Sequence, residues 1–211
     1  MEKRKNFPDK FTPAGKIIFP KGEQLELKIK TKIDSGVVRV AFLTDDFWNI
    51  RQTRQLTVLS RVFSERLRLV IREDLGATYS PYAYNDPSKI FKNYGILHVV
   101  AKVNPEKHTF VYNKIKDIVN SIIMDGITKK ETDLALKPVL NHLKVIRKTN
   151  DYWLNSVMAN VSVYPEKFDW ANTIMHDYNA ITQDDLMLLA KKYLNIDDSA
   201  LIVIRPGNSA D

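Results

Sequence analysis

The sequence contains no cysteine and only seven glycines among its 211 residues. Without cysteine the chain can form no disulfide, no thiolate zinc site and no thiol nucleophile, although a cysteine-free protein can occupy any redox compartment. The glycines form neither a Gly-x-Gly-x-x-Gly turn nor a phosphate-binding loop. The sequence therefore gives no support to nucleotide chemistry, and it leaves the compartment open.

Long apolar runs are also missing. Stretches such as Ala200 to Ile204 are far shorter than the roughly 20 residues that a membrane-spanning helix needs. The first twenty residues start basic but never reach the apolar run of a secretory signal, and Pro8 and Pro13 interrupt them. We therefore expect a soluble protein with no membrane partner, which is not a precursor and can be an excised or processed piece of a longer protein.

Self-sufficient active-site motifs are absent as well. A zinc hydrolase needs two histidines one helical turn apart and a nearby glutamate, as in His-Glu-x-x-His or the inverse His-x-x-Glu-His. No such run occurs here. None of the four histidines has a glutamate at the required offset: His98, His108, His142 and His176. A Gly-x-Ser-x-Gly nucleophile elbow is also missing. The sequence predicts no metal site and no catalytic residue acting in this chain alone.

The charge balance is basic, at +7 with a pI near 9.4. A basic protein favours acidic partners such as nucleic acid, an anionic membrane surface or acidic peptides. The positive charges are spread among 25 acidic residues, and the densest cluster, Lys3 to Lys5, lies in the terminal arm. A nucleic-acid binder would need a contiguous positive face with exposed aromatic residues, and no such stripe is visible, so we expect no nucleic-acid partner.

The chain is long enough for one sizeable core, with 44% hydrophobic residues. Residues Met1 to Phe11 are polar and contain proline, which is typical of a linker. We predict a polar arm or linker over residues 1–14, a single folded unit over 15–207 and a short tail over 208–211.

The first part of that unit alternates strands and a helix. Period-2 alternation predicts a strand over Leu25 to Ile29 with one buried face, and a more apolar strand covers Val37 to Leu43. Asp34-Ser35-Gly36 is predicted to form the turn between them. Helical spacing then predicts a long amphipathic helix from about Asn49 to Glu73, with Gly76 at its C-terminal cap.

Two further strands and a second helix follow. The strands are expected around Thr78 to Tyr84 and Gly95 to Val103, separated by a turn at Asn85 to Ser88. The helix is expected from about Pro105 to Met124. Its buried stripe consists of Val111, Ile115, Ile118 and Ile122.

The C-terminal part is expected to be mainly helical. Thr128 begins a capping-box pattern, in which a glutamate three residues later completes the helix start, and Pro138 should kink this helix or mark a junction between two shorter ones. Thr182 opens the last helix in the same way, and Ala200 to Ile204 forms a closing strand. Between them a further helical segment is predicted to present Trp153, Val157, Val161 and Tyr164 on one face.

This order of elements predicts the fold class. Consecutive strands joined by short turns pair antiparallel, and the helices are numerous enough to cover one face of a sheet. We therefore expect an α+β fold with an antiparallel-rich sheet covered on one face by a cluster of helices, rather than a doubly wound parallel sheet.

One segment contains an arginine and a tyrosine that could act as hydrogen-bond donors to a substrate. Arg72-Glu73-Asp74-Leu75-Gly76-Ala77-Thr78-Tyr79-Ser80 leads from a helix end into a strand. Its simplest interpretation is structural, because an arginine in the last helical turn complements the helix dipole and a tyrosine packs well on a sheet.

The same segment resembles the pitrilysin/insulinase family of zinc metallopeptidases, which includes the mitochondrial processing peptidases. Non-catalytic domains of that family carry Arg-Glu-x-Leu-Gly-x-x-Tyr-Ser, matched here from Arg72 to Ser80. Asp125-Gly126 with Thr128-x-x-Glu131 resembles the family's helix opening, and Ile181 to Pro206 resembles its closing helix and strand. Together these matches cover most of residues 36–206, in the expected order.

The resemblance implies a half-domain that holds substrate but carries no zinc. In such enzymes one unit supplies His-x-x-Glu-His and zinc, and its partner unit supplies the arginine and tyrosine. Arg72 and Tyr79 would then bind the substrate carbonyl and the oxyanion that forms when zinc-bound water attacks. The implied partners are a metal-bearing half, in the same protein or another subunit, and an unfolded peptide.

Alternatives remain open at this point. The chain can be a fragment of a longer peptidase, the non-catalytic subunit of a two-chain enzyme, or a lineage that lost catalysis. It can also be a structural or assembly module of the same fold, with Arg72 and Tyr79 serving only the fold. A half-clamshell leaves an apolar partner-facing patch, so the isolated chain can form homo-oligomers. A bacterial periplasm or cytoplasm is the preferred compartment.

Overall fold

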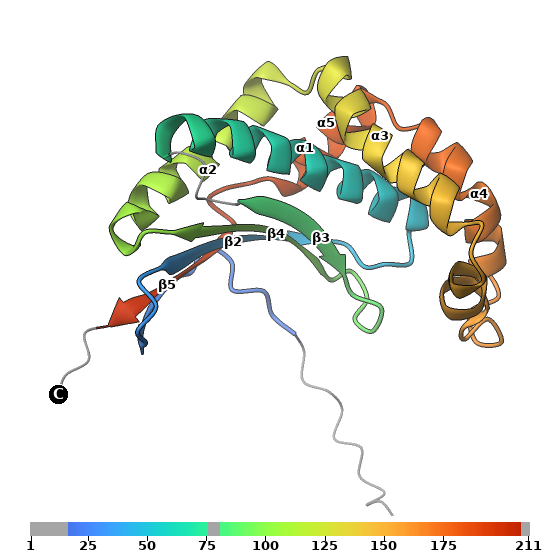
Figure 1. Ribbon diagram of the computed structural model, residues 1–211, viewed down its shortest axis with the longest axis horizontal. Helices are drawn as coiled ribbons and strands as arrows, with labels where there is room; N and C mark the ends of the chain where they lie inside the picture. Colours follow the sequence, from blue (N-terminus) through green and yellow to red (C-terminus); the bar gives the residue numbers. More distant parts are fainter. Residues whose placement is uncertain (1–16, 76–80, 208–211) are drawn as a thin grey trace, which may run out of the picture.

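The molecule consists of one mixed sheet with helices packed on one of its faces (Figure 1). The computed structural model describes residues 17–75 and 81–207. The strands are β1 (Gln24–Lys30), β2 (Gly36–Thr44), β3 (Tyr82–Pro87), β4 (Gly95–Val103) and β5 (Ala200–Gly207). The α-helices are α1 (Ile50–Leu75), α2 (His108–Asp125), α3 (Lys129–Ile146), α4 (Lys167–Asn179) and α5 (Gln183–Tyr193). A 3₁₀ turn, η1 (Pro105–Lys107), precedes α2, and a π-helix, η2 (Tyr152–Met158), lies between α3 and α4.

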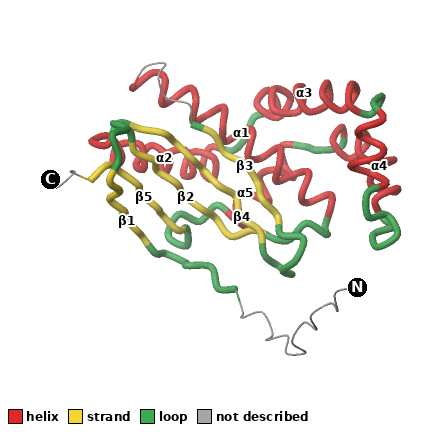
Figure 2. The backbone as a smooth tube through the Cα atoms, turned by 60° about the horizontal axis from the view of Figure 1, so that its bottom comes forward, coloured by secondary structure: helices red, strands yellow, loops and turns green. Residues whose placement is uncertain are grey.

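The predicted α+β fold is confirmed. The strand order is β1-β5-β2-β4-β3, and every pairing is antiparallel except that of β1 with β5 (Figure 2). The strand over Gly95–Val103 was predicted with the bounds that the structure has. Helices α1, α2, α3 and α5 also occur where the sequence predicted them.

The core lies between the sheet and the helices. Alternating residues of β2 point into it because a strand turns successive side chains to opposite faces. The central strands and α1 supply many of its fully buried side chains: Val38, Val40, Phe42, Leu56, Leu59, Phe63, Leu67, Leu97 and Val99. The buried stripe expected for α2 is confirmed.

The first strand was predicted correctly in position but not in environment. All seven residues of β1 are exposed, so the expected buried face does not exist. β1 also does not pair with β2, because β5 lies between them and pairs with both. An edge strand that pairs through its backbone needs no buried side chains to stay in the sheet, and alternation alone could not reveal this.

The turn predicted at Asn85 to Ser88 was also placed wrongly. Asn85, Asp86 and Pro87 belong to β3, and the chain turns after them. Pro87 is tolerated there because β3 is an edge strand, where a missing N–H costs little.

Pro138 does not divide the third helix. α3 runs without a break from Lys129 to Ile146, so the predicted junction is wrong. Proline removes the hydrogen bond to the carbonyl four residues earlier, here that of Leu134, a residue that is 57% exposed. Water can satisfy that carbonyl, while Ala135 and Val139 stay buried on the core side.

The segment expected to place Trp153, Val157, Val161 and Tyr164 on one helical face does not form such a helix. Residues Tyr152–Met158 form η2, turns follow, and α4 begins only at Lys167. In η2 the buried residues are Tyr152 and Val157, which are separated by the i→i+5 hydrogen-bond interval of a π-helix.

Candidate functional site

The two residues singled out from the sequence lie at the limit of what the structure describes. Arg72 belongs to the last turns of α1, but its side chain is outside the described residues. Tyr79 falls between the described ranges 17–75 and 81–207. Their role therefore stays a prediction, and the site is approached through the elements that carry them.

The middle of α1 is bonded directly to β3, the strand that follows the Arg72–Ser80 segment in sequence. The hydroxyl of Ser64 accepts from the N–H of Ala83 at 2.8 Å, and its one hydrogen lies between the carbonyls of Ser60 at 2.9 Å and Ala83 at 3.1 Å. One side chain of α1 is thus bonded to the backbone of β3. Ser64 lies about two turns before Arg72 on the same helix, so this contact fixes the middle of α1 against the sheet.

A second anchor holds α1 to the start of α3. Arg66 donates from Nε to Glu131 Oε1 at 2.7 Å, and its Nη2 donates to the carbonyl of Gly126 at 2.6 Å. Partial burial opposes ionisation of Glu131, but hydrogen bonds from Arg66 and Thr128 outweigh burial and lower the pKa of Glu131 from 4.5 to about 2. This pair links α1 to the capping box that the sequence predicted at Thr128, and that box is confirmed.

The sheet face away from the helices carries a polar cluster beside β3. Arg39 Nε donates to His98 Nδ1 at 3.2 Å, and Arg39 Nη2 donates to the hydroxyl of Tyr84 at 3.1 Å. The rings of Tyr84 and His98 lie 4.8 Å apart, and Tyr82 stacks on Tyr84. No described helix covers this face (Figure 1).

Burial and the positive charge of Arg39 lower the pKa of His98 from 6.5 to about 4. His98 is therefore neutral at physiological pH, as its acceptance of a hydrogen bond from Arg39 also requires. Across the described residues, no group of three or more histidine, cysteine, aspartate or glutamate side chains is arranged to hold a metal ion.

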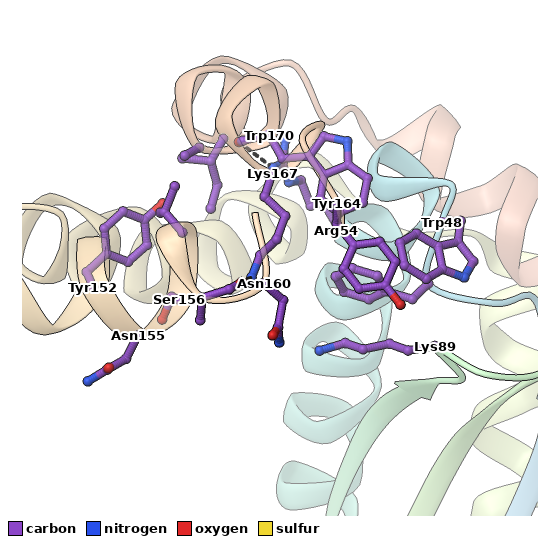
Figure 3. Close-up of a pocket in the computed structure, with 15 residues that line it drawn as sticks. Trp48, Arg54, Lys89, Tyr152, Asn155, Ser156, Asn160, Tyr164, Lys167 and Trp170 are labelled. Atoms are coloured by element: carbon purple, nitrogen blue, oxygen red, sulfur yellow. Dashed lines mark hydrogen bonds between the residues drawn. The ribbon is translucent and has the colours of Figure 1, made fainter. Parts of the chain in front are cut away.

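Sequence reasoning missed an aromatic cavity at the opposite end of α1. It has a volume of about 460 Å³, and Figure 3 shows its lining. Phe47 and Trp48 come from the connection before α1, whereas Tyr164 and Trp170 come from the region of α4. Trp48 and Tyr164 lie 4.8 Å apart and Phe47 and Trp170 lie 5.6 Å apart, measured between ring centroids.

The wall behind this cavity is a buried ion pair. Arg54 on α1 forms a salt bridge with Asp177 on α4 and donates to the carbonyl of Trp170 at 2.7 Å. Both charged side chains are buried. The pairing of α1 with α4 therefore sets the positions of Trp170 and of the cavity floor, and no spacing in the sequence signals that contact.

Comparison with known proteins identifies the family. The family model described as "Peptidase M16 inactive domain" matches residues 2–139. The chain belongs to this family, which confirms the resemblance to pitrilysin/insulinase-type metallopeptidases.

Curated relatives carry the same indication. The chloroplastic stromal processing peptidase of Pisum sativum is 25% identical over 147 residues, which cover 68% of this chain and 12% of that protein. An uncharacterized zinc protease of Mycobacterium leprae is 27% identical over 139 residues, covering 66% of this chain and 30% of that protein. The chain thus spans less than a third of the length of either relative.

Solved structures share the fold. A protease from Helicobacter pylori superposes with a TM-score of 0.74 at 15% identity, over 95% of this chain and 49% of that one. A peptidase M16 inactive domain from Pseudomonas fluorescens gives a TM-score of 0.72 at 15% identity, over 91% of this chain and 45% of that one. An inactive peptidase domain from Bordetella parapertussis is covered over its whole length, with 88% of this chain, a TM-score of 0.69 and 10% identity.

Proposed function

We propose that this chain is the substrate-holding half of a zinc metalloendopeptidase, working against a zinc site on a partner half. The observation that carries the proposal is the match to the M16 inactive domain over residues 2–139, which includes the Arg72–Ser80 segment. Arg72 and Tyr79 would donate to the carbonyl of the scissile bond and to the oxyanion formed in the transition state.

The physical case rests on fixed donors. A guanidinium is charged at any working pH, and a phenol is a neutral donor below its pKa, so both can stabilise developing negative charge. The anchors at Ser64 and Arg66 support this role because they hold the helix that carries Arg72 against β3 and α3. A donor that is already in position before the reaction does not have to be reoriented when the oxyanion forms, so no free energy is spent on reorganisation at that step.

Zinc would be bound by the partner half, as the names of the zinc-protease relatives suggest for the family. That half would supply the metal-activated water, and this chain would bind and orient an unfolded peptide. β3 is an edge strand close to the end of the Arg72–Ser80 segment, so its free backbone groups offer a place for an extended peptide. We expect no nucleic-acid partner.

The isolated chain is expected to self-associate. Leu25, Leu27 and Ile29 are exposed on β1, and Tyr82 and Tyr84 are exposed on β3. Apolar groups without a partner half would favour contacts between copies.

None of the described helices is long and apolar enough to cross a bilayer. A bacterial periplasm or cytoplasm remains the expected compartment.

The test is peptidase activity on an unstructured peptide with added zinc. The chain alone, the metal-bearing half from the same genome alone, and their mixture are compared. We expect cleavage only by the mixture, and Arg72→Ala should lower its rate on the order of 10²- to 10³-fold. Arg61→Ala, an exposed arginine on the same helix, is the matched control and should change little.

An assembly module of the same fold is the competing function. Under that hypothesis the two halves still associate, but the mixture is inactive or is indifferent to Arg72→Ala. Association is therefore measured in parallel by sedimentation for each variant. Normal assembly combined with unchanged cleavage in Arg72→Ala would contradict the substrate-holding role.

A further inference from the structure

We propose that the aromatic cavity, lined by Phe47, Trp48, Lys89, Tyr164 and Trp170 among others, binds the C-terminal aromatic residue of a peptide through its ring and its free carboxylate. This site lies beside the start of α1, whereas Arg72 is in the last turns of that helix, and it needs no zinc-bearing half. The proposal therefore goes beyond the proposed function and can be tested separately from it.

The cavity has the size and chemistry of a binding site. Its volume of about 460 Å³ lies in the range of roughly 300 to 1,000 Å³ that is usual for small-ligand pockets. One wall is aromatic, formed by Trp48, Tyr164, Phe47 and Trp170 with tilted or edge-on contacts between neighbouring rings. Trp48, Phe47 and Trp170 are only partly buried and Tyr164 is exposed, so their rings retain surface for another ring.

Two lysines make the cavity positive. Lys89 comes from the loop after β3, and Lys167 comes from the first residue of α4. Figure 3 shows Lys89 running beneath the rings of Trp48 and Tyr164 with its ammonium group toward Asn160. Among the described residues that line the cavity there is no aspartate or glutamate, and the charge of Arg54 is already paired with Asp177.

The ammonium groups of the two lysines make different contacts. Lys167 donates to the carbonyl of Ala159, which holds its ammonium group at the cavity wall. Lys89 is exposed and lies 4.8 Å from the centroid of the Phe47 ring, a cation–π contact that leaves its ammonium donors free to turn to an anion. An aromatic ligand with a carboxylate therefore finds both a stacking surface and a charge partner.

The remaining lining favours a peptide over a smaller acid. Asn155, Ser156 and Asn160 are exposed and line the same cavity. Amide and hydroxyl groups match the donors and acceptors of a peptide backbone. Asn155 and Ser156 are carried by η2, and π-helical turns occur frequently at functional sites because they displace side chains from the regular helical positions.

The test uses the chain itself and four synthetic ligands. The first is a short N-acetylated glycine–serine peptide that ends in phenylalanine with a free carboxylate. The others are the same peptide as its C-terminal amide, the same peptide ending in leucine, and N-acetylphenylalanine. Because none of these ligands contains tryptophan, binding is followed by the emission of Trp48, Trp153 and Trp170 and confirmed by calorimetry.

We expect the free-acid phenylalanine peptide to bind, and amidation to weaken it roughly tenfold through the lost charge-assisted hydrogen bond. Lys89→Gln should cause a similar loss for the acid and almost none for the amide, so that the two changes are not additive. Tyr164→Leu should weaken the acid and the amide alike, by roughly two- to tenfold. Lys130→Gln, an exposed lysine in the first turn of α3, is the control and should leave binding unchanged.

Three results would overturn the proposal. The first is no saturable binding of the free-acid peptide by a chain whose thermal unfolding is normal. The second is equal binding of acid and amide, or of the Lys89→Gln variant and the original chain. The third is binding of N-acetylphenylalanine without binding of the peptide, which would exclude a peptide end as the occupant.

Discussion

The burial and the pKa of His98 are set by its neighbours on the uncovered sheet face. It is only 5% exposed, yet it lies on the side of the sheet that no described helix covers. Arg39 and the ring of Tyr84 shield it instead of a hydrophobic layer. Burial together with the charge of Arg39 lowers the pKa of His98 to about 4, so the folded chain resists its protonation.

Stability should therefore fall as the pH drops from 6.5 toward 4. In that interval the unfolded chain takes up a proton on this histidine and the folded chain does not, which favours unfolding. We expect a loss of roughly 1 to 2 kcal/mol, less than the full shift implies because solvent reaches the open face. Urea unfolding at pH 7 and pH 4.5 measures it.

His98→Gln should remove most of this pH dependence, and His142→Gln, an exposed histidine on α3, should retain it. An unchanged difference between the two pH values in His98→Gln would show that another group is responsible. Glu131, whose pKa is lowered from 4.5 to about 2, loses its contribution as the pH falls from 4.5 toward 2, below the interval in which His98 acts.

Helix starts and helix contacts contribute to stability in different ways. The capping boxes at Thr128 and Thr182 are local, because each involves a side chain and backbone N–H groups within one turn. The Arg54–Asp177 pair joins α1 and α4, which are separated by more than a hundred residues in sequence.

Thr128→Ala should destabilise the chain by about 1 kcal/mol, because the N–H of Glu131 loses its side-chain acceptor. Thr109→Ala, an exposed threonine in the first turn of α2, is the matched control and should change stability by less than about 0.5 kcal/mol. Equal effects of the two substitutions in urea unfolding would argue against a specific cap.

Asp177→Ala should be much more damaging, by about 3 to 5 kcal/mol, because it leaves the guanidinium of Arg54 buried without its counter-charge. Replacing both residues by apolar ones, as in Arg54→Met with Asp177→Leu, should recover much of that loss. A double variant no more stable than Asp177→Ala would show that packing at α4, rather than the unpaired charge, dominates.

At the scale of the whole molecule, the described residues form two layers, a sheet and a layer of helices on one of its faces. Helices cover one sheet face (Figure 1). The other face carries polar and aromatic side chains around Arg39 beside exposed apolar residues on β1. The chain spans only part of each relative that it matches. If the proposed function holds, a partner half would supply the zinc, and activity would be a property of the assembled halves.

Much of the fold followed from local signals. β2 and β4 were predicted as short, largely apolar stretches, α1 and α2 from apolar residues at helical spacing, and the starts of α3 and α5 from their capping residues. The family motif at Arg72–Ser80 could also be identified from sequence, since it is a contiguous run. The orientation of its side chains was not predictable in this way.

The aromatic cavity was not predictable because its residues come together only in the folded chain. Trp48 and Trp170 are far apart in sequence, and Tyr164 was assigned to a regular helical face that does not exist. A π-helix has i→i+5 hydrogen bonds in place of i→i+4 bonds, so its side chains depart from the 3.6-residue spacing that a search for helical periodicity uses.

By itself the sequence determined the capped starts of α3 and α5, the central strands and the family. Caps, apolar patterns and a contiguous motif each act within a few residues. Only the tertiary structure decided that β5 separates β1 from β2, that β1 stays exposed, and that Phe47, Trp48, Tyr164 and Trp170 enclose one cavity. Those features depend on backbone pairing and burial between distant segments, whose free energy is gained only when the whole chain packs.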